Sequence, residues 1–190
     1  SLQGGDAADW LLGGDGDDIL LGDPLINQTA ITMGSGLITK AGGLNGSFAT
    51  ARVINSNYSL AANPDIGSAT LVPHLTVNAH LGSNASGDYY RLNDLVDGQC
   101  ITLDIDRATL AGELETRIYL YDMDGNEVSR SESWTDPSTG GSGSVDGEDG
   151  YLRFYAPHAG DFVVRVADDG FFGATSDHYL LQVSFGAEGG

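Results

Sequence analysis

In the stretch CITLDIDR, residues 100–107, every second residue from position 101 to position 105 is aliphatic, and polar residues stand between them. The three aliphatic side chains would lie on one face of an extended chain, whereas Asp104 and Asp106 would lie on the other. This two-residue period predicts a β-strand that buries one face in a core.

The same period recurs along most of the chain. The further alternating segments are 75–79, 90–92, 118–120, 152–154, 162–166 and 179–185. Turn residues separate them, and Asp124-Gly125 is typical of a tight hairpin. Because no helical period is sustained anywhere, the sequence predicts an all-β fold: an antiparallel β-sandwich or jelly roll.

Composition restricts the class of partner. The chain has 190 residues, with 27 Asp and Glu against 8 Lys and Arg, and its formal net charge is −19. Nucleic acid and anionic membranes would be repelled, so we expect neither nucleic-acid binding nor membrane insertion. The apolar fraction of 41% is too high for a disordered acidic tail. With Cys100 as the only cysteine, no internal disulfide can form, and bound metal is the alternative means of stabilising the loops.

Two consecutive nonapeptides stand near the N-terminus. Residues 4–12 read GGDAADWLL and residues 13–21 read GGDGDDILL, which both follow the pattern G-G-x-G-x-D-x-U-x, with Ala7 replacing one glycine. Glycines permit tight turns whose carbonyls point inward, and the Asp adds a charged oxygen. The alternative interpretation is a flexible Gly/Asp-rich linker.

These nonapeptides resemble the calcium-binding RTX repeats of secreted bacterial proteins, which wind into a parallel β-roll. In that family, an ion lies between loops that are two nonapeptides apart. The resemblance implies a short RTX β-roll-like segment with Asp9, Asp18 and Asn27 as calcium ligands. Because the chain begins in mid-repeat, we expect it to be a piece of a longer polypeptide whose export signal lies elsewhere.

A second resemblance covers residues 47–186. Its motifs are Asn63-Pro64-Asp65 and the residues up to Thr70, followed by segments 73–77, 87–92, 103–106, 117–126 and 156–166. Their order and spacing resemble the pre-peptidase C-terminal domain family, a β-sandwich module of secreted proteases and RTX adhesins. We therefore expect RTX repeats at 1–24, a connector at 25–46, the sandwich at 47–186 and a tail at 187–190.

Acidic residues after position 100 form a candidate metal site. Asp104 and Asp106 share one strand face, and the resemblance implies that acids from neighbouring loops converge with Asp104 near one edge of the sandwich. The candidate Ca²⁺ ligands are Asp104, Asp106, Glu115, Glu132, Asp136 and Asp149. Calcium takes six to eight oxygens, which such a cluster could supply. The alternative is that these are ordinary solvated turn acids.

Two loops carry candidate ligand contacts. Trp134 and Asp136 lie in the Ser/Gly-rich loop 131–150, and Phe171 and Phe172 lie between glycines. Each aromatic residue could contact a ligand or could instead pin its own loop to the sandwich. An ion held in the loop could then accept one more oxygen from outside.

Taken together, the two resemblances imply the ligand-binding region of a large RTX adhesin, exported by type I secretion to the cell surface. There it would recognise a peptide on a target cell, possibly by its C-terminal carboxylate, beside neighbouring adhesin domains. A glycan-binding module, a calcium-rigidified spacer and an accessory domain of a secreted protease are the alternatives. We expect no enzyme, because the chain has no H-E-x-x-H or G-x-S-x-G motif, and Cys100 has no recognisable catalytic partner.

Overall fold

A computed structural model of the chain describes residues 2–3, 20–21, 35–40, 45–55, 57–66, 72–81, 87–107, 115–131, 141, 143–144, 149–168 and 178–185. Two three-residue 3-10 helices, η2 (Phe48–Thr50) and η3 (Pro64–Ile66), lie within these residues. The strands are β1 (Leu2–Gln3), β2 (Leu20–Leu21), β3 (Leu37–Thr39), β4 (Arg52–Val53), β5 (His74–His80), β6 (Asp88–Leu95), β7 (Cys100–Arg107), β8 (Thr116–Tyr121), β9 (Glu127–Arg130), β10 (Tyr151–Tyr155), β11 (Gly160–Asp168) and β12 (His178–Ser184).

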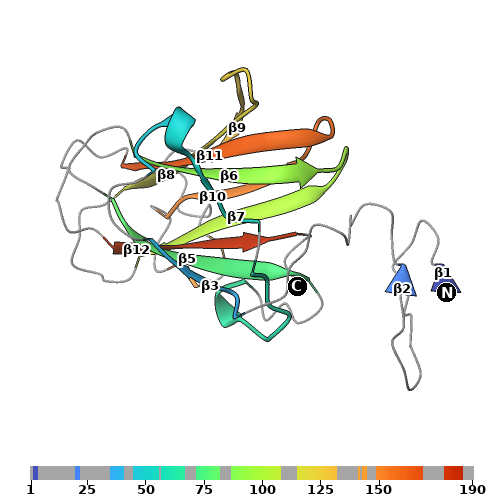
Figure 1. Cartoon of the computed structure of the whole chain (residues 1–190). Helices are drawn as coiled ribbons and strands as arrows, with labels where there is room; N and C mark the ends of the chain where they lie inside the picture. The colour runs from blue at the N-terminus through green and yellow to red at the C-terminus, as the bar shows by residue number, and fades with distance from the viewer. Residues whose placement is uncertain are drawn as a thin grey trace.

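Strands β3 to β12 form two five-stranded sheets packed face to face (Figure 1). The order in the first sheet is β10-β7-β12-β5-β3, and in the second it is β4-β6-β11-β8-β9. The long central strands pair antiparallel, as in the registers of β12 with β5 and with β7. The predicted all-β sandwich is therefore confirmed.

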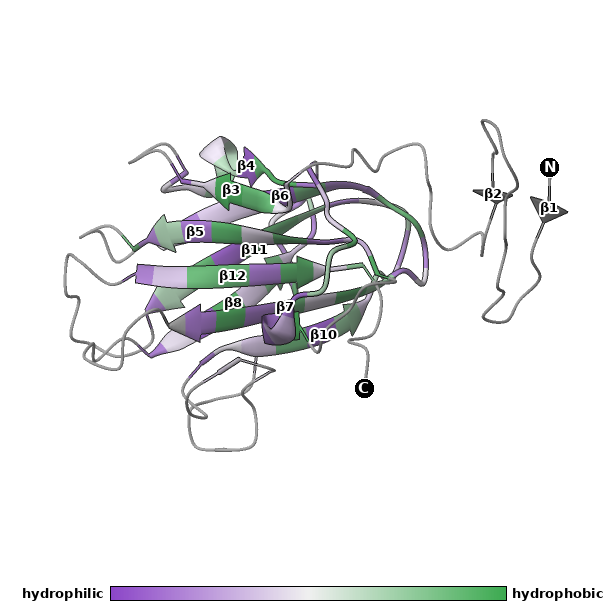
Figure 2. Ribbon diagram, turned by 90° about the horizontal axis from the view of Figure 1, so that it is seen from below, coloured by the Kyte–Doolittle hydropathy of each residue, from purple (hydrophilic) through white to green (hydrophobic). Residues whose placement is uncertain are grey.

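The core lies between the two sheets and follows the alternation of the sequence (Figure 2). Ile101, Leu103 and Ile105 of β7 are fully buried there, opposite the similarly buried Phe162 and Val164 of β11. Each of the predicted alternating segments forms one of the strands of these sheets. Burial of aliphatic side chains at every second position is therefore what holds the sheets together.

Each sheet ends in a short parallel strand that the period-two pattern does not predict. β3 pairs parallel with β5, with Ile38 opposite Val77, and β4 pairs parallel with β6. Both strands come from residues 37–53, so the described part of the expected connector contributes a strand to the sandwich. A strand of two or three residues is too short to show a period.

The predicted hairpin turn joins β8 to β9. Gly125 has a φ of +84°, and its N–H donates to the Asp122 carbonyl at 3.1 Å. The Asp122 carboxylate also accepts hydrogen bonds from the N–H groups of Asp124 and Asn126 at 3.0 and 2.8 Å. The D-x-D-G-N sequence therefore forms a hairpin turn that is stabilised by hydrogen bonds among its own residues.

A buried polar chain links the two sheets at one end of the core. The Tyr90 and Tyr179 hydroxyl oxygens lie 2.6 Å apart, and the Tyr179 hydroxyl donates to Asp88 Oδ2 at 2.7 Å. The other Asp88 oxygen pairs with the Lys40 ammonium group, which also donates to the His80 carbonyl at 2.9 Å. Burial is the main reason that the pKa of Tyr179 lies well above its ordinary value, so this hydroxyl stays protonated.

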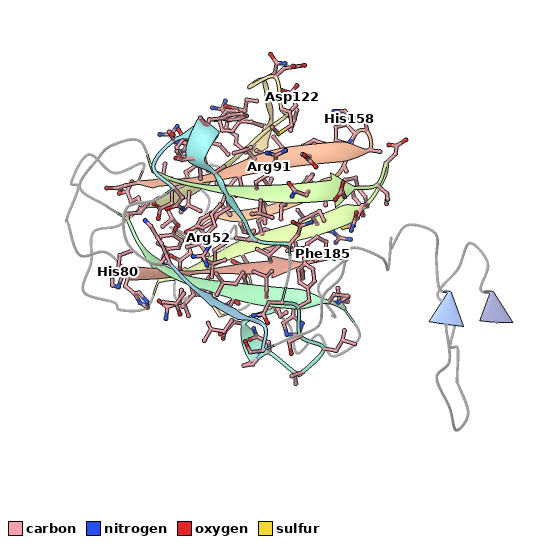
Figure 3. All side chains as sticks on the ribbon, viewed as in Figure 1. Arg52, His80, Arg91, Asp122, His158 and Phe185 are labelled. Carbon is pink, nitrogen blue, oxygen red and sulfur yellow. The ribbon has the colours of Figure 1, made fainter. Side chains whose placement is uncertain are left out.

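An ion pair between β6 and β11 lies on the outer face of the second sheet, where Arg91 contacts Asp161 (Figure 3). The other Asp161 oxygen accepts a hydrogen bond from the backbone N–H of Asp94 at 2.8 Å. Partial burial alone would raise the pKa of Asp161, but these two hydrogen bonds and the Arg91 charge hold it below its ordinary value. The ionised carboxylate is thus the form that the fold stabilises.

Replacing this carboxylate has a pH-dependent cost. Folding lowers the pKa of Asp161, so its ionised carboxylate stabilises the fold fully at pH values above the pKa of the unfolded state. This stabilisation is lost as the pH falls through the pKa of the folded state. We expect Asp161→Asn to lower the free energy of unfolding by about 1 kcal/mol near pH 7, and the difference from wild type to shrink toward pH 3. Urea unfolding at both pH values measures this, with the exposed Asp97→Asn as the control. A difference in the free energy of unfolding that is the same at both pH values would contradict the lowered pKa of Asp161.

The N-terminal pair of strands, β1 and β2, is parallel, with Leu2 opposite Leu20 and Gln3 opposite Leu21. Paired residues are thus 18 positions apart, which is the length of two nonapeptides. Within the described part of the chain, no helix is long and apolar enough to cross a membrane.

Candidate functional site

Asp104 and Asp106 lie on the outer face of the first sheet, as the sequence predicts, but they are not exposed to solvent. Asp104 is 0% and Asp106 is 6% exposed, and the neighbouring outward residues Thr102 and Gln182 are 1% exposed. An outer sheet face is normally solvated, so other segments must cover this one. We call Asp65, Asp104, Asp106 and Gln182 the acidic face.

The 3-10 helix η3 provides one part of the cover. Its Asp65 points to the acidic face, and Gln182 Nε2 donates both to Asp106 Oδ2 at 2.9 Å and to Asp65 Oδ2 at 3.5 Å. The Asn63 side chain accepts a hydrogen bond from the Asp65 N–H at 3.0 Å, which fixes the turn that presents Asp65. Two carboxylates from sequence-distant segments therefore share one amide group.

Gln182 is held in place by its other end. Its Oε1 accepts hydrogen bonds from Thr76 Oγ1 at 2.6 Å and from Asn63 Nδ2 at 3.4 Å. Strand β12 lies between β5 and β7, so this glutamine connects Thr76 of β5 to Asp106 of β7. The amide is oriented with its nitrogen toward the carboxylates.

Gly141, Gly143 and Ser144 approach the strand that carries Asp104 and Asp106. A β-carbon at Gly141 would lie 1.9 Å from Asp104 Oδ2, and one at Gly143, where φ is +92°, would lie 2.8 Å from Asp106 Oδ1 and 3.0 Å from Asp65 Cβ. Ser144 Oγ also donates to the Ile105 carbonyl at 3.4 Å. Glycine is needed at positions 141 and 143 because the loop backbone approaches the carboxylates so closely.

This close approach gives a stability prediction for Gly141. We expect Gly141→Ala to destabilise the fold by about 1–3 kcal/mol, because the new methyl group displaces either the loop or the Asp104 carboxylate. Chemical denaturation measures the effect. Gly125→Ala is the control, because a β-carbon there meets nothing within 4 Å and only the positive φ is strained. Wild-type stability for Gly141→Ala would show that the loop does not close on Asp104.

Asp149 and Glu115 each precede a residue that takes part in a link between the two sheets. Asp149 is 1% exposed, and the adjacent Gly150 joins the two sheets: its carbonyl accepts from the Ile105 N–H at 2.9 Å, and its N–H donates to Thr116 Oγ1 at 2.8 Å. Thr116 directly follows Glu115. These bonds place Asp149 next to the stretch of β7 that carries Asp104 and Asp106, and Glu115 next to the residue of β8 that binds Gly150.

The structure describes only some of the predicted site residues. Asp104 and Asp106 are described on β7, Glu115 directly before β8, and Asp149 two residues before β10. The others lie outside the described residues: Asp9, Asp18, Asn27, Glu132, Trp134, Asp136, Phe171 and Phe172.

Asp65 and Gln182 belong to this face but were not predicted as site residues from the sequence. Asp65 was part of a turn motif, and Gln182 occupies an outward position of β12, the one signal that could have placed it on this face. Their contact joins segments 117 residues apart.

The donor set of this face is chemically uniform. The oxygens that this face presents are carboxylate oxygens, because Gln182 turns its amide nitrogen toward Asp65 and Asp106. Such oxygens are preferred by hard cations such as Ca²⁺ and Mg²⁺. Among the described residues, no group of three or more His, Cys, Asp or Glu side chains is arranged to hold a metal ion. The described acids alone therefore do not make a complete calcium site, which takes six to eight oxygens.

Two of the solved structures that resemble this chain do so at low sequence identity. The pre-peptidase C-terminal domain of collagenase from Bacillus anthracis is 16% identical, with a TM-score of 0.40, and the match covers 58% of this chain and 88% of that one. PliG, a periplasmic lysozyme inhibitor of g-type lysozyme from Aeromonas hydrophila, is 14% identical, with a TM-score of 0.37, and the match covers 82% of this chain and 97% of that one.

No family model and no curated protein sequence matches the chain. The first structural neighbour is a pre-peptidase C-terminal domain, the family that the strand motifs resemble. At these TM-scores we take no function from either protein.

Proposed function

We propose that the chain is a calcium-dependent ligand-binding module of a large secreted adhesin, acting outside the cell. The observation that carries the proposal is the acidic face, where Asp104 and Asp106 are buried beside Asp65 under a glycine loop. Bringing carboxylates together in a buried place is unfavourable unless positive charge compensates them. The chain itself carries a net charge of −19, and a bound cation would supply positive charge beside these carboxylates.

The pairing of β1 with β2 supports calcium-binding repeats at the N-terminus. A parallel pair whose partners are 18 residues apart has the spacing that one coil of two nonapeptides requires. In such a coil the loops that carry Asp9, Asp18 and Asn27 would supply the oxygens for calcium. We therefore propose that the N-terminal segment is a second calcium-binding part of this chain.

At the acidic face, calcium would supply a fixed positive charge. Asp104 and Asp106, joined by Glu115, Glu132, Asp136 and Asp149, would hold it, and the loop 131–150 would be ordered in consequence. Ordering a loop rich in Ser and Gly costs conformational entropy, which the binding free energy of the ion can offset. The chain's own residues thus build a site whose shape depends on the ion.

The ligand proposed is a peptide, held through a carboxylate. A negatively charged oxygen interacts more strongly with a divalent cation than a neutral sugar hydroxyl does. Trp134, Phe171 and Phe172 are the aromatic residues that would contact the rest of the ligand. The proposal assigns no catalytic step to the domain.

The test is a binding screen of the full chain against free-C-terminus peptides and glycans, first in calcium and then in EDTA. The proposal predicts peptide hits that vanish in EDTA, that weaken when the C-terminus is amidated, and that are lost in Asp104→Asn. Asp124→Asn, which removes the same charge from the exposed β8–β9 turn, should bind as wild type does. Hits confined to glycans would replace the peptide by a sugar. An absence of binding both in calcium and in EDTA would contradict ligand binding. It would favour the alternatives of a spacer or of an accessory domain of a secreted protease.

A further inference from the structure

Two histidines face each other at one end of the first sheet, outside the acidic face. His80 and His178 are directly opposite in the antiparallel register of β5 and β12. Their ring centroids are 4.6 Å apart, with 44° between the ring planes. Figure 3 labels the exposed His80, which lies far from His158 in the view. Directly opposed positions on neighbouring strands hold two side chains within reach of one point.

A neighbour on β5 indicates the tautomer of the neutral His178 ring. His178 Nε2 contacts Asn78 Oδ1, and because an amide oxygen can only accept, Nε2 carries the proton. The lone pair of this imidazole is then on Nδ1. Desolvation, and to a smaller extent the neighbouring His80, lowers the pKa of His178, which favours the neutral ring.

One cation that contacts the pair is already in an ion pair. The Lys40 ammonium group donates to the His80 carbonyl at 2.9 Å, but it is paired with Asp88. The nearest carboxylate of the acidic face along the sheet is Asp106, which lies opposite Leu180 and not opposite His178. Leu180 therefore stands between the histidine pair and the acidic face on β12.

We propose that His80 and His178 form a two-imidazole site for a divalent transition ion such as Zn²⁺, Ni²⁺ or Cu²⁺. Imidazole nitrogen suits these ions, whereas calcium prefers oxygen, so the two sites would select different metals. Asn78 is a positioning residue that orients the His178 ring, as outer partners of metal-bound histidines do. With two protein ligands, the remaining coordination positions are open to water or to a donor from another molecule.

The test uses the full chain in excess calcium, so that carboxylate sites are occupied. Paramagnetic Cu²⁺ is titrated in substoichiometric steps while the imidazole proton signals of all four histidines are followed by NMR. The proposal predicts that the His80 and His178 signals broaden together, before those of His74 and His158. Simultaneous broadening of all four, or broadening of only one of the pair, would overturn it.

Calorimetry with Zn²⁺ supplies the second readout. His80→Asn and His178→Asn should each weaken Zn²⁺ binding by at least about tenfold, and Asn78→Ala by about tenfold. His158→Asn is the matched control and should bind as wild type does. Equal Zn²⁺ affinity in wild type and in both pair variants would refute the site. Because calcium is present throughout, this outcome is independent of the acidic face and of the proposed adhesin function.

Discussion

Removing calcium with EDTA is expected to lower the melting temperature of the chain by on the order of 10–20 °C. An ion that binds only the folded state stabilises it by mass action, and its loss also removes the positive charge that the ion would place beside Asp104 and Asp106. Differential scanning calorimetry in calcium and in EDTA measures the difference. An unchanged melting temperature would remove the calcium argument at both the repeats and the acidic face.

Asp106→Asn distinguishes the effect of calcium at the acidic face from its effect at the N-terminal repeats. This carboxylate is 6% exposed and accepts a hydrogen bond from Gln182 at 2.9 Å, which an asparagine oxygen can also accept. In EDTA the variant should melt at or above the wild-type temperature, because one repelling charge is gone. In calcium it should melt below wild type, because a ligand is lost. Asp124→Asn is the charge-matched control and should follow wild type in both conditions.

Asp88→Ala is expected to destabilise the fold by about 3–5 kcal/mol. Asp88 is 3% exposed, and its oxygens hold both the Lys40 ammonium group and the Tyr179 hydroxyl. Without it, a side-chain cation that is 8% exposed and a buried hydroxyl both lose a hydrogen-bond acceptor. Urea unfolding in saturating calcium measures the loss.

A double-mutant cycle with Lys40→Met identifies the source of that loss. If the cost comes from the uncompensated ammonium group, the double variant should be more stable than the sum of the two single effects predicts. Additive effects would instead mean that Asp88 acts independently of Lys40. Val128→Ala on the exposed strand β9 should change stability little and checks that the assay is specific.

The sandwich was predictable because its central strands carry their pattern locally. In β7, Ile101, Leu103 and Ile105 alternate with polar residues, and the structure buries all three between the sheets. A short strand in the connector is compatible with its sequence, but the bounds and pairing of the parallel edge strands β3 and β4 were not predictable, because they are two or three residues long. Their position depends on pairing with β5 and β6, which no local pattern records.

The candidate site was predictable in part, for the same reason. Asp104 and Asp106 share a strand face, so their common orientation follows from the strand itself. The burial of that face could not be foreseen, because it depends on Asp65 and on Gly141 and Gly143, which reach it from two distant loops. Gln182, which contacts both Asp65 and Asp106, is linked to them only through the register of β12 with β7.

The most direct measurement is a crystal structure of the full chain grown with calcium, with anomalous scattering used to locate the ions. The account predicts an anomalous peak at the acidic face, about 2.3–2.6 Å from carboxylate oxygens of Asp104 and Asp106, with a coordination position open to solvent or to a bound carboxylate. A peak fully enclosed by protein oxygens would leave calcium a structural role only. No peak at the acidic face, in crystals that bind calcium at the N-terminal repeats, would contradict the proposed site.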